Sequence, residues 1–203
     1  MPDRPPPAAE EPALADSPVV DESVYAATQL GVPFDGRIIS VRQDRVEMPD
    51  SGNAVRDVVV HPGAVGVLAL DDDDRVVLIR QFRHPVRRYL WEIPAGIKDV
   101  AGEPELETAK RELAEEAGLA ARDWSPLLSL HLSPGGSTES ATIFLARGLS
   151  EVARPEGFAL TAEENDMRLR YVPLAEALDA VLTGRMRNSL AVSGILAAHA
   201  VRG

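Results

Sequence analysis

The amino-acid sequence predicts a fold built from both helices and strands, of class α/β (α+β), in which a mixed β-sheet lies between helices. Apolar, strand-like segments dominate the first half of the chain, one amphipathic helix follows near residue 105, and further strands precede two C-terminal helices. This order is typical of a sheet covered by helices. The chain has 203 residues, of which 45% are hydrophobic, so one domain with a substantial core is expected.

The N-terminal part divides into two stretches. Residues 1–22 are rich in proline, alanine and acidic residues, a composition that cannot form a core, so we expect a disordered tail. Apolar residues then recur over 37–48, which predicts a strand pair or a bent strand, and 55–61 is a second strand. Asp50-Ser51-Gly52-Asn53 between them is a predicted turn, and Pro62-Gly63 ends the second strand.

The middle of the chain contains two almost continuous apolar runs, 64–70 and 76–82, which predict buried strands. Four aspartates, Asp71 to Asp74, separate them and allow two interpretations, a metal site or a hairpin loop. Polar residues of high turn propensity are what a hairpin loop needs, and the loop is the favoured interpretation. Residues 89–93 predict a short strand that leads into Pro94-Ala95-Gly96.

A helix is predicted over residues 104–118, with Pro104 in its first turn and Gly118 at its C-terminal end. Leu106, Ala109, Leu113 and Ala117 recur at helical spacing and give this helix an apolar stripe for the core.

Further elements are predicted downstream of this helix. Strands are predicted at 126–132, 140–146 and 165–172, and helices at 174–182 and 189–201.

Glu112, Glu115 and Glu116 lie three and four residues apart, so their carboxylates share one face of that helix. Like charges at these spacings destabilise a helix by roughly 0.2–0.5 kcal/mol per pair, and the C-terminal end of the helix dipole disfavours them further. A bound divalent cation would reverse both effects, since hard cations take carboxylate oxygens. The alternative is a solvated acidic face with no ligand.

The region around this helix resembles the Nudix box, a glycine followed by a glutamate and an Arg-Glu-apolar-x-Glu-Glu-x-Gly-apolar run. The matching residues are Gly96, Glu103, Arg111, Glu112, Glu115, Glu116, Gly118 and Leu119. Six residues separate Gly96 from Glu103 where the family usually has five, and we expect the extra residue to bulge in the loop before the helix. The resemblance, over about residues 37–200, implies the Nudix fold, with an additional N-terminal antiparallel sheet.

Three further segments resemble the ADP-ribose pyrophosphatase branch of the family. They are Arg80-Gln81-Phe82-Arg83-His84-Pro85, Trp91-Glu92-Ile93-Pro94-Ala95-Gly96 and the loop 133–139. That branch has a proline sixteen residues beyond the box glycine, and Pro134 lies sixteen beyond Gly118. The implied domains are a tail (1–22), an N-terminal β segment for dimerisation (23–62) and a Nudix hydrolase domain (63–203).

The resemblance also implies roles for individual residues. The expected Mg2+ ligands (Mn2+ is an alternative) are the carbonyl of Ala95 and the carboxylates of Glu112, Glu115 and Glu116, with Glu103 and Arg111 as a supporting ion pair. Glu139 is expected to serve as base or to position the metal and the attacking water. The expected substrate contacts are Arg83, Asp99, Ser133 and Gly135, with Arg56 reaching the site of a partner in a homodimer. The alternatives are a surface ion pair for Arg83 and a plain polar loop residue for Glu139.

Composition limits the function classes. A net charge of −11 argues against a nucleic-acid partner, and the absence of cysteine excludes disulfides, thiolate metal sites and cysteine nucleophiles. No apolar run is long enough for a membrane span and no secretory signal is visible, so a cytoplasmic enzyme is expected. The histidines, His61, His84, His131 and His199, are interpreted as structural or surface residues.

The sequence thus predicts Mg2+-dependent hydrolysis of ADP-ribose to AMP and ribose 5-phosphate. A related interpretation is hydrolysis of another nucleoside diphosphate sugar or dinucleotide. A third, from a different class, is a non-catalytic module that senses a nucleotide; the loss of a box carboxylate would favour it, and every box carboxylate is present.

Overall fold

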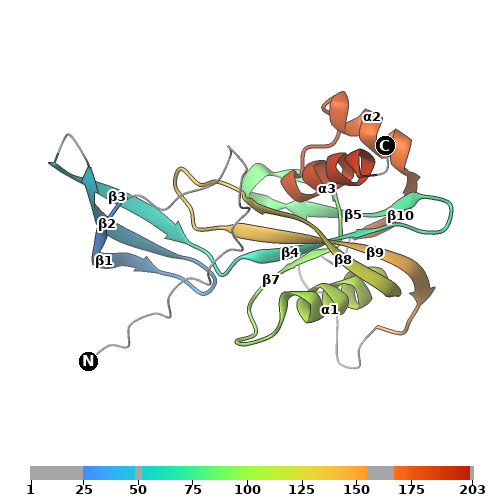
Figure 1. Ribbon diagram of the computed structural model, residues 1–203, viewed down its shortest axis with the longest axis horizontal. Helices are drawn as coiled ribbons and strands as arrows, with labels where there is room; N and C mark the ends of the chain where they lie inside the picture. The colour runs from blue at the N-terminus through green and yellow to red at the C-terminus, as the bar shows by residue number, and fades with distance from the viewer. Residues whose placement is uncertain (1–24, 49–51, 155–166, 202–203) are drawn as a thin grey trace, which may run out of the picture.

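A computed structural model describes residues 25–48, 52–154 and 167–201, and within these ranges the chain forms three β-sheets and three α-helices (Figure 1). The central sheet has four strands in the order β7-β4-β9-β8. Strands β4 and β9 run parallel, whereas β4–β7 and β8–β9 are antiparallel, so the sheet is mixed as predicted. Its strands are β4 (Ala64–Ala69), β7 (Ala95–Ile97), β8 (Leu119–His131) and β9 (Ser140–Glu151).

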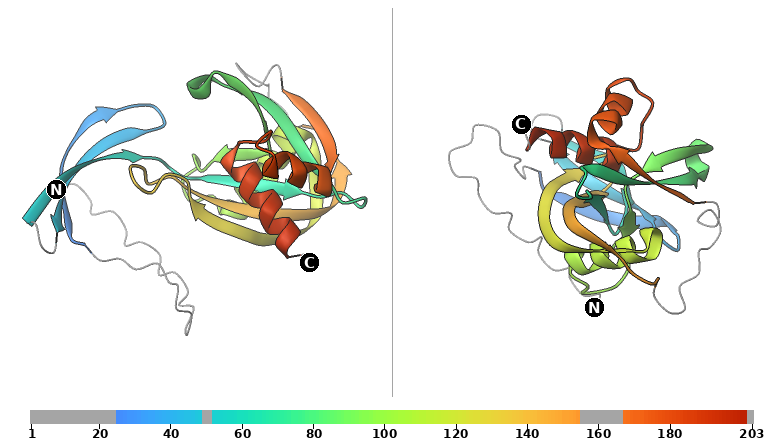
Figure 2. Two further views of the ribbon diagram at one scale, coloured as in Figure 1. Left: turned by 90° about the horizontal axis from the view of Figure 1, so that it is seen from above. Right: turned by 90° about the vertical axis from the view of Figure 1, so that its right-hand side faces the viewer.

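Helices cover both faces of the central sheet (Figures 1 and 2). Strand β4 is buried along its whole length, and its side chains alternate between two apolar clusters. Val65 and Val67 pack toward α1 (Glu105–Ala117) with Leu113, while Leu68 packs with Ile195 of α3 (Ser189–Ala200). The predicted sheet between helices is therefore confirmed, and the continuous apolar run at 64–70 is the strand that both layers of helices bury.

The second sheet is antiparallel, with the strand order β10-β5-β6. Its strands are β5 (Arg75–Arg83), β6 (Arg88–Glu92) and β10 (Arg168–Pro173), and a 3-10 helix (His84–Val86) joins the first two. The aspartates 71–74 form the predicted loop as a tight turn, in which the N–H of Asp74 donates to the carbonyl of Asp71. Strands β4 and β5 share only the bridge between Leu70 and Val76 before they enter different sheets, so the turn is a corner between sheets.

The N-terminal sheet consists of β1 (Ala27–Asp35), β2 (Ser40–Met48) and β3 (Gly52–Val60), all antiparallel, and confirms the additional sheet. It projects from the body, to which β3 connects it (Figures 1 and 2). No strand was predicted at 27–35, because β1 contains Gly31 and Pro33 and lies exposed at a sheet edge, where propensity and periodicity are weak.

The first half of β8 was also missed, since the prediction began at 126 and the strand begins at Leu119. Residues such as Arg122 and Asp123 are exposed there and interrupt the apolar pattern, and a bulge at Pro126–Leu128 shifts the register with β9. The strand pairing with β9 overrides the weak local pattern.

The two C-terminal helices agree closely with prediction. Helix α2 is Leu174–Leu182, and α3 is capped by the side chain of Asn188, which accepts from the N–H of Ala191.

The predicted apolar stripe of α1 is confirmed. Ala109 and Leu113 are buried in the core, Leu106 and Ala117 pack against it, and Gly118 ends the helix with a left-handed φ of 65°. Pro104 immediately precedes the helix, one position before the predicted first turn. A turn in which the N–H of Glu103 donates to the carbonyl of Val100 lies before the helix, in the loop where the extra residue was expected.

Several predictions concern residues outside the described ranges: the tail at 1–22, Asp50 and Ser51 of the first turn, and 165–166 of the strand now seen as β10. The division of the chain at residue 62 stays a prediction.

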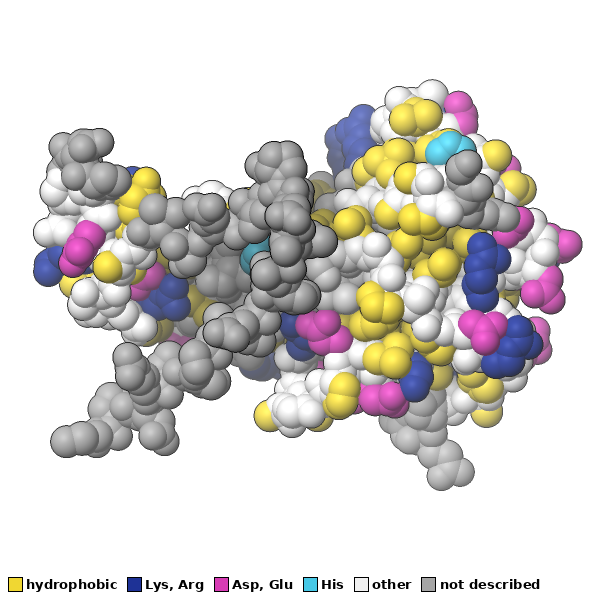
Figure 3. Space-filling view, viewed as in Figure 1, with side chains coloured by type: hydrophobic (Ala, Val, Ile, Leu, Met, Phe, Trp, Pro, Cys, Tyr) yellow, Lys and Arg dark blue, Asp and Glu magenta, His cyan; other side chains and the backbone are white. Residues whose placement is uncertain are grey.

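Apolar side chains gather over the end of the molecule that carries α2 and α3, and charges of both signs lie around them (Figure 3). Among the described residues, no helix is long and apolar enough to cross a membrane.

Candidate active site

Three of the five glutamates of α1, Glu112, Glu115 and Glu116, lie on one helix face and are largely withdrawn from solvent. The side chains of Glu112 and Glu115 are 12% and 16% exposed, and Glu116 as a residue is 7% exposed. The adjacent face of the helix packs into the core through Ala109 and Leu113, so the helix cannot rotate to relieve the crowding. The fold thus holds three like charges together in a place of low solvent exposure.

Glu112 packs directly on the backbone of Gly96 in β7. A Cβ added at residue 96 would lie 2.1 Å from the carboxyl carbon of Glu112, which no side chain tolerates. Burial is the main cause that raises the pKa of Glu112 to about 7; the charge of Arg111 opposes the shift and that of Glu115 adds to it. Gly96 is therefore the residue that lets the carboxylate approach the backbone of the strand.

Arg111 lies among the carboxylates that precede and follow it in the helix. It donates from one terminal nitrogen to Oε1 of Glu112 (2.8 Å) and Oε2 of Glu115 (3.2 Å), and from the other to Oε2 of Glu103 (3.3 Å). Burial works to lower the pKa of Arg111, but the hydrogen bond to Glu103 and the charges of Glu112, Glu103 and Glu115 raise it above its usual value overall. Hydrogen bonds from Arg111 and from Thr108 in turn lower the pKa of Glu103.

Glu116 connects the helix to the start of β7. Its Oε2 accepts the backbone N–H of Ala95 (2.8 Å), and Ala95 pairs with Gly66 of the buried strand β4. The C-terminal end of the helix is closed by Arg154, whose guanidinium donates to the carbonyls of Glu115 (2.9 Å) and Glu116 (3.4 Å). Arg154 supplies the cation that the helix dipole favours at this end, a role that sequence reasoning did not assign to any residue.

A cavity of about 340 Å3 opens beside these residues and brings several predicted site residues together. Arg83, Ala95, Gly96 and Glu139 all line it, although they come from β5, β7 and the loop before β9. Its other lining residues are His61, Ala64, Leu90, Glu92, Ile97, Leu132, Asn188, Ser189 and Leu190. Residues far apart in sequence thus converge on one cavity, which meets the box-like segment 96–119 at Gly96 and Ile97.

Arg83 is held in this cavity by a buried carboxylate. Its Nε donates to both oxygens of Glu92 (3.0 and 3.2 Å) and a terminal nitrogen donates to Oε2 (2.6 Å), while Glu92 is only 1% exposed. A fork-shaped pair of this kind fixes the plane of the guanidinium. Sequence reasoning named Arg83 and missed Glu92, although an acidic residue inside an apolar strand was a usable signal.

The loop that carries Glu139 is tied to the end of β3. The N–H of Val59 donates to the carbonyl of Gly136, and the N–H of Thr138 donates to the carbonyl of Val59, both at 2.9 Å. Within the loop, the hydroxyl of Ser137 accepts the N–H of Glu139 (3.1 Å). Figures 1 and 2 show the loop between β8 and β9 extending toward β3. The position of Glu139 therefore depends on the N-terminal sheet.

The remaining predicted contacts lie outside the lining of this cavity. Ser133 and Gly135 are exposed in the loop, and the carbonyl of Ser133 accepts the N–H groups of Gly136 and Ser137. Asp99 is close to Arg111, with 3.7 Å between their charged atoms, and so lies beside the helix. Arg56 is exposed on β3 and donates to the carbonyl of its neighbour Val55.

The donor set suits a hard divalent cation. Carboxylate oxygens of Glu112, Glu115 and Glu116 and the carbonyl of Ala95 are the ligand type that Mg2+ prefers. The raised pKa of Glu112 indicates a carboxylate that a nearby cation would stabilise in its charged form. In the described part of the chain, no three acidic or histidine side chains are arranged to hold a metal as they stand. Arg111 bridges Glu112 and Glu115, and Glu116 is turned to Ala95, so these side chains would have to rearrange.

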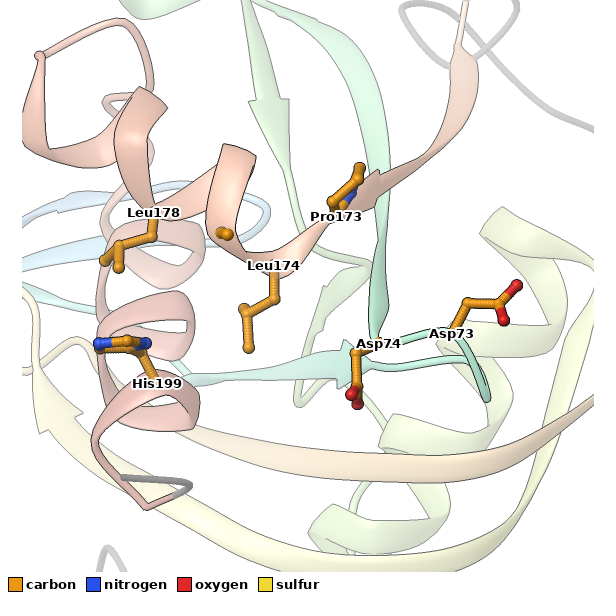
Figure 4. A pocket seen from close by; sticks show the side chains of 7 residues that line it. Asp73, Asp74, Pro173, Leu174, Leu178 and His199 are labelled. Carbon is orange, nitrogen blue, oxygen red and sulfur yellow. The ribbon is translucent and has the colours of Figure 1, made fainter.

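A larger cavity of about 510 Å3 lies between the turn at Asp73–Asp74, the start of α2 and His199 near the end of α3 (Figure 4). Its lining residues are Asp73, Asp74, Pro173, Leu174, Ala175, Leu178 and His199. Its lining, drawn from the described residues, includes none of the predicted site residues. Asp74 is engaged by Arg147 at 3.4 Å, and the floor of the cavity is apolar. Size alone therefore does not identify the reactive site.

Comparisons with known proteins identify the family and the fold. A family model described as NUDIX domain matches residues 60–192. The chain is 49% identical over 166 residues to an ADP-ribose pyrophosphatase of Mycobacterium tuberculosis, covering 82% of this chain and 79% of that protein. It is 39% identical over 131 residues to an ADP-ribose pyrophosphatase of Bacillus subtilis, covering 64% and 69%. The crystal structure of an ADP compounds hydrolase has the same fold, with a TM-score of 0.71 at 24% identity, covering 88% of this chain and 95% of that one.

Proposed function

The chain belongs to the Nudix family, and from this premise we propose that it is an ADP-ribose pyrophosphatase that releases AMP and ribose 5-phosphate. The observation that carries the proposal is the convergence of Arg83, Ala95 and Glu139 on one cavity beside the glutamates of α1. The names of the relatives at 49% and 39% identity support ADP-ribose as the substrate.

Nudix hydrolases use a divalent metal, and we propose Mg2+, with Mn2+ as a substitute. Glu112, Glu115, Glu116 and the carbonyl of Ala95 would hold it. When bound, a divalent cation offsets charge on the diphosphate and lowers the pKa of a nearby water. Arg111 contacts Glu103, Glu112 and Glu115, and these contacts keep the carboxylates of those three residues near one another without a metal. Titration calorimetry with Mg2+ tests the assignment, since Glu116→Gln should weaken binding and an unchanged Mg2+ affinity would contradict it.

The hydrolysis itself requires a water aligned with the diphosphate more than it requires covalent catalysis. Oxygen from water bonds to a phosphorus atom, the bond from that phosphorus to the bridging oxygen breaks, and the water's protons must be removed. Glu139 supplies a carboxylate at the cavity that can accept a proton from the water. Arg83, oriented by Glu92, offers a permanently charged group to the phosphates.

The rigid pairing of Arg83 with Glu92 limits how Arg83 binds substrate. If Arg83 left Glu92, the carboxylate of Glu92 would remain buried without its partner, which typically costs several kcal/mol. We therefore propose that Arg83 stays paired with Glu92 when the substrate binds. Its charge then contributes mainly to orientation.

A panel of substrates tests the proposed function. ADP-ribose, other nucleoside diphosphate sugars and dinucleotides are incubated with the protein and Mg2+, and products are separated by anion-exchange chromatography. AMP and ribose 5-phosphate in equal amounts, formed fastest from ADP-ribose, are expected. Faster turnover of another compound would replace the substrate but keep the reaction. Binding of ADP-ribose without turnover of any compound would replace the enzyme by a nucleotide-sensing module.

We further propose that the N-terminal sheet forms a homodimer and that Arg56 serves the partner's site. This sheet projects from the body (Figure 1). It exposes apolar side chains that a monomer leaves uncovered. They are Leu30, Val32, Phe34, Ile38, Ile39 and Val55, of which Phe34 is 53% exposed. Sedimentation at micromolar concentration tests this proposal: a dimer is expected, and a fully active monomer would contradict it.

A further inference from the structure

His61 follows the last residue of β3 and lines the cavity that contains Arg83 and Glu139. From the sequence it was interpreted as a structural or surface residue, since the Nudix box and its flanking motifs give it no role. Its place in the cavity separates it from the other histidines. His131 is exposed at the end of β8, and His199 lies in the other cavity at the opposite end of α3 (Figure 4).

The hydrogen bond to Gly63 determines which ring nitrogen of His61 carries the proton. The backbone N–H of Gly63 donates to Nδ1 of His61 at 3.0 Å. A neutral imidazole has one donor nitrogen and one acceptor nitrogen, so an Nδ1 that accepts leaves the proton on Nε2. The neutral side chain of His61 is therefore held as a hydrogen-bond donor at Nε2.

The backbone of His61 is tied to the loop that carries Glu139. Its N–H donates to the hydroxyl of Thr138 at 3.0 Å, and the neighbouring Val59 exchanges backbone hydrogen bonds with Thr138 and Gly136. His61 and Glu139 are thus positioned by one set of contacts between β3 and the loop. A donor fixed in this way needs little reorganisation when a substrate arrives.

We propose that His61 is a substrate-contacting residue whose Nε2–H donates to a phosphoryl oxygen of the nucleoside diphosphate compound in this cavity; the proposal rests on the proposed function. The electrostatics of the cavity favour such a group. The charge of Arg83 is offset by Glu92, and Glu139 adds a negative charge, so an anionic substrate needs additional donors. A neutral N–H supplies one without requiring a counterion.

Two substitutions separate substrate contact from a merely structural role. His61→Asn keeps an oxygen near the position of Nδ1 that can accept the N–H of Gly63, but it removes the donor at Nε2. His61→Gln reaches the position of Nε2 with an N–H donor and lacks the acceptor for Gly63. If Nε2 contacts the substrate, kcat/KM for ADP-ribose should fall about 10–100-fold in His61→Asn, the range expected for losing a hydrogen bond to a charged group. His61→Gln should then retain most of the activity.

The opposite pattern would overturn the proposal: full activity in His61→Asn together with reduced activity in His61→Gln means that His61 only supports Gly63. Thermal unfolding of both variants shows whether either has lost the fold. His199→Asn is the matched control and should behave as wild type, because it lies in the other cavity. If both His61 variants unfold, the nitrogen resonances of His61 in the wild-type protein decide the matter instead.

Those resonances also distinguish failure of this inference from failure of the proposed function. The protonated Nε2 of His61 should be visible by nitrogen NMR without substrate, and ADP-ribose should shift it. A shift on binding in a protein that does not hydrolyse ADP-ribose would support the contact while refuting the function. Hydrolysis of ADP-ribose with no shift at His61, and no effect of His61→Asn, would refute the contact while leaving the function intact.

Discussion

The aspartates 71–74 and the glutamates Glu112, Glu115 and Glu116 of α1 are two acidic clusters in the described part of the chain, and their environments differ. In the turn, Asp71 accepts the backbone N–H groups of Asp73 and Arg75 and the side chain of Arg75, whose own side chain is 44% exposed. In the helix, Glu112 and Glu115 share the guanidinium of Arg111 with Glu103 of the preceding loop. The turn satisfies its charges locally and near water, whereas the helix concentrates them where water is scarce.

The two clusters also differ in the pKa values of their carboxyl groups. Burial works to raise the pKa of Asp71, but hydrogen bonds from the backbone and side chain of Arg75 lower it overall. Burial raises the pKa of Glu112 to about 7, because Arg111 compensates for it only in part. A run of acidic residues is therefore no guide to a metal site by itself. A candidate metal site is distinguished by burial of more carboxylate charge than the neighbouring Arg and Lys side chains neutralise.

Removal of divalent cations should have the largest effect and separates the two clusters most sharply. Excess chelator is expected to abolish hydrolysis of ADP-ribose, and added Mg2+ should restore it, because the glutamates of α1 are the proposed ligands. Steady-state rates across a Mg2+ titration measure this. Asp72→Asn in the turn is the matched control and should leave the midpoint of the titration unchanged. Full activity in chelator would contradict the metal assignment. A shifted midpoint in Asp72→Asn would show that the aspartate turn also affects Mg2+ binding.

Glu139 tests whether a functional carboxylate must lie in one of these clusters, because it is a candidate base in a loop outside both of them. Glu139→Gln keeps size and hydrogen bonding but removes the proton acceptor, so kcat should fall roughly 10²–10⁴-fold if Glu139 is the base. Substrate affinity and stability should change little. Steady-state kinetics and a separate binding measurement test it, with Glu151→Gln at the end of β9 as a control. A kcat within a few-fold of wild type would return the search for a base to Glu112, Glu115 and Glu116.

Gly96→Ala tests whether the burial of Glu112 matters. The new Cβ would fall 2.1 Å from the carboxyl carbon, so the carboxylate must move. We expect activity and Mg2+ affinity to fall at least about 10-fold, the scale seen when the surroundings of a metal ligand are disturbed. Gly31→Ala in β1 is the control, since an added Cβ there meets nothing within 4 Å. Unchanged Mg2+ affinity in Gly96→Ala would show that the position of Glu112 is unimportant for the ion.

Asp71→Asn should have the smallest effect, confined to stability. The pKa of Asp71 is lowered in the folded state, so its charge stabilises the protein above the unfolded pKa of 3.8, and that stabilisation is lost as the pH falls through the folded value. The contribution near neutral pH should be below about 1 kcal/mol, since the pair with Arg75 is partly exposed. Thermal unfolding between pH 2 and 7 should show a slightly flatter acid limb in the variant, with unchanged activity. An activity loss would mean that the turn does more than join two sheets.

Sequence alone determined the features that depend on covalent spacing. The period of 3.6 residues places Glu112, Glu115 and Glu116 on one side of a helix and the apolar stripe through Ala109 and Leu113 on the side next to it, whatever the rest of the chain does. The continuous apolar run of β4 predicted a strand buried on both faces. The sequence did not predict β1 or the first half of β8, because both are largely exposed and their pairing with neighbouring strands decides their conformation.

Only the tertiary structure decided which distant residues meet. Glu92 reaches Arg83 through the pairing of β5 with β6, and Arg154 reaches the end of α1 because β9 returns there. His61 joins Glu139 because the end of β3 pairs with the loop that carries Glu139. Such contacts depend on strand register and on the crossing of layers, and no local pattern encodes them. The sequence therefore predicted the ligands on one helix, while the fold assembled the cavity beside them.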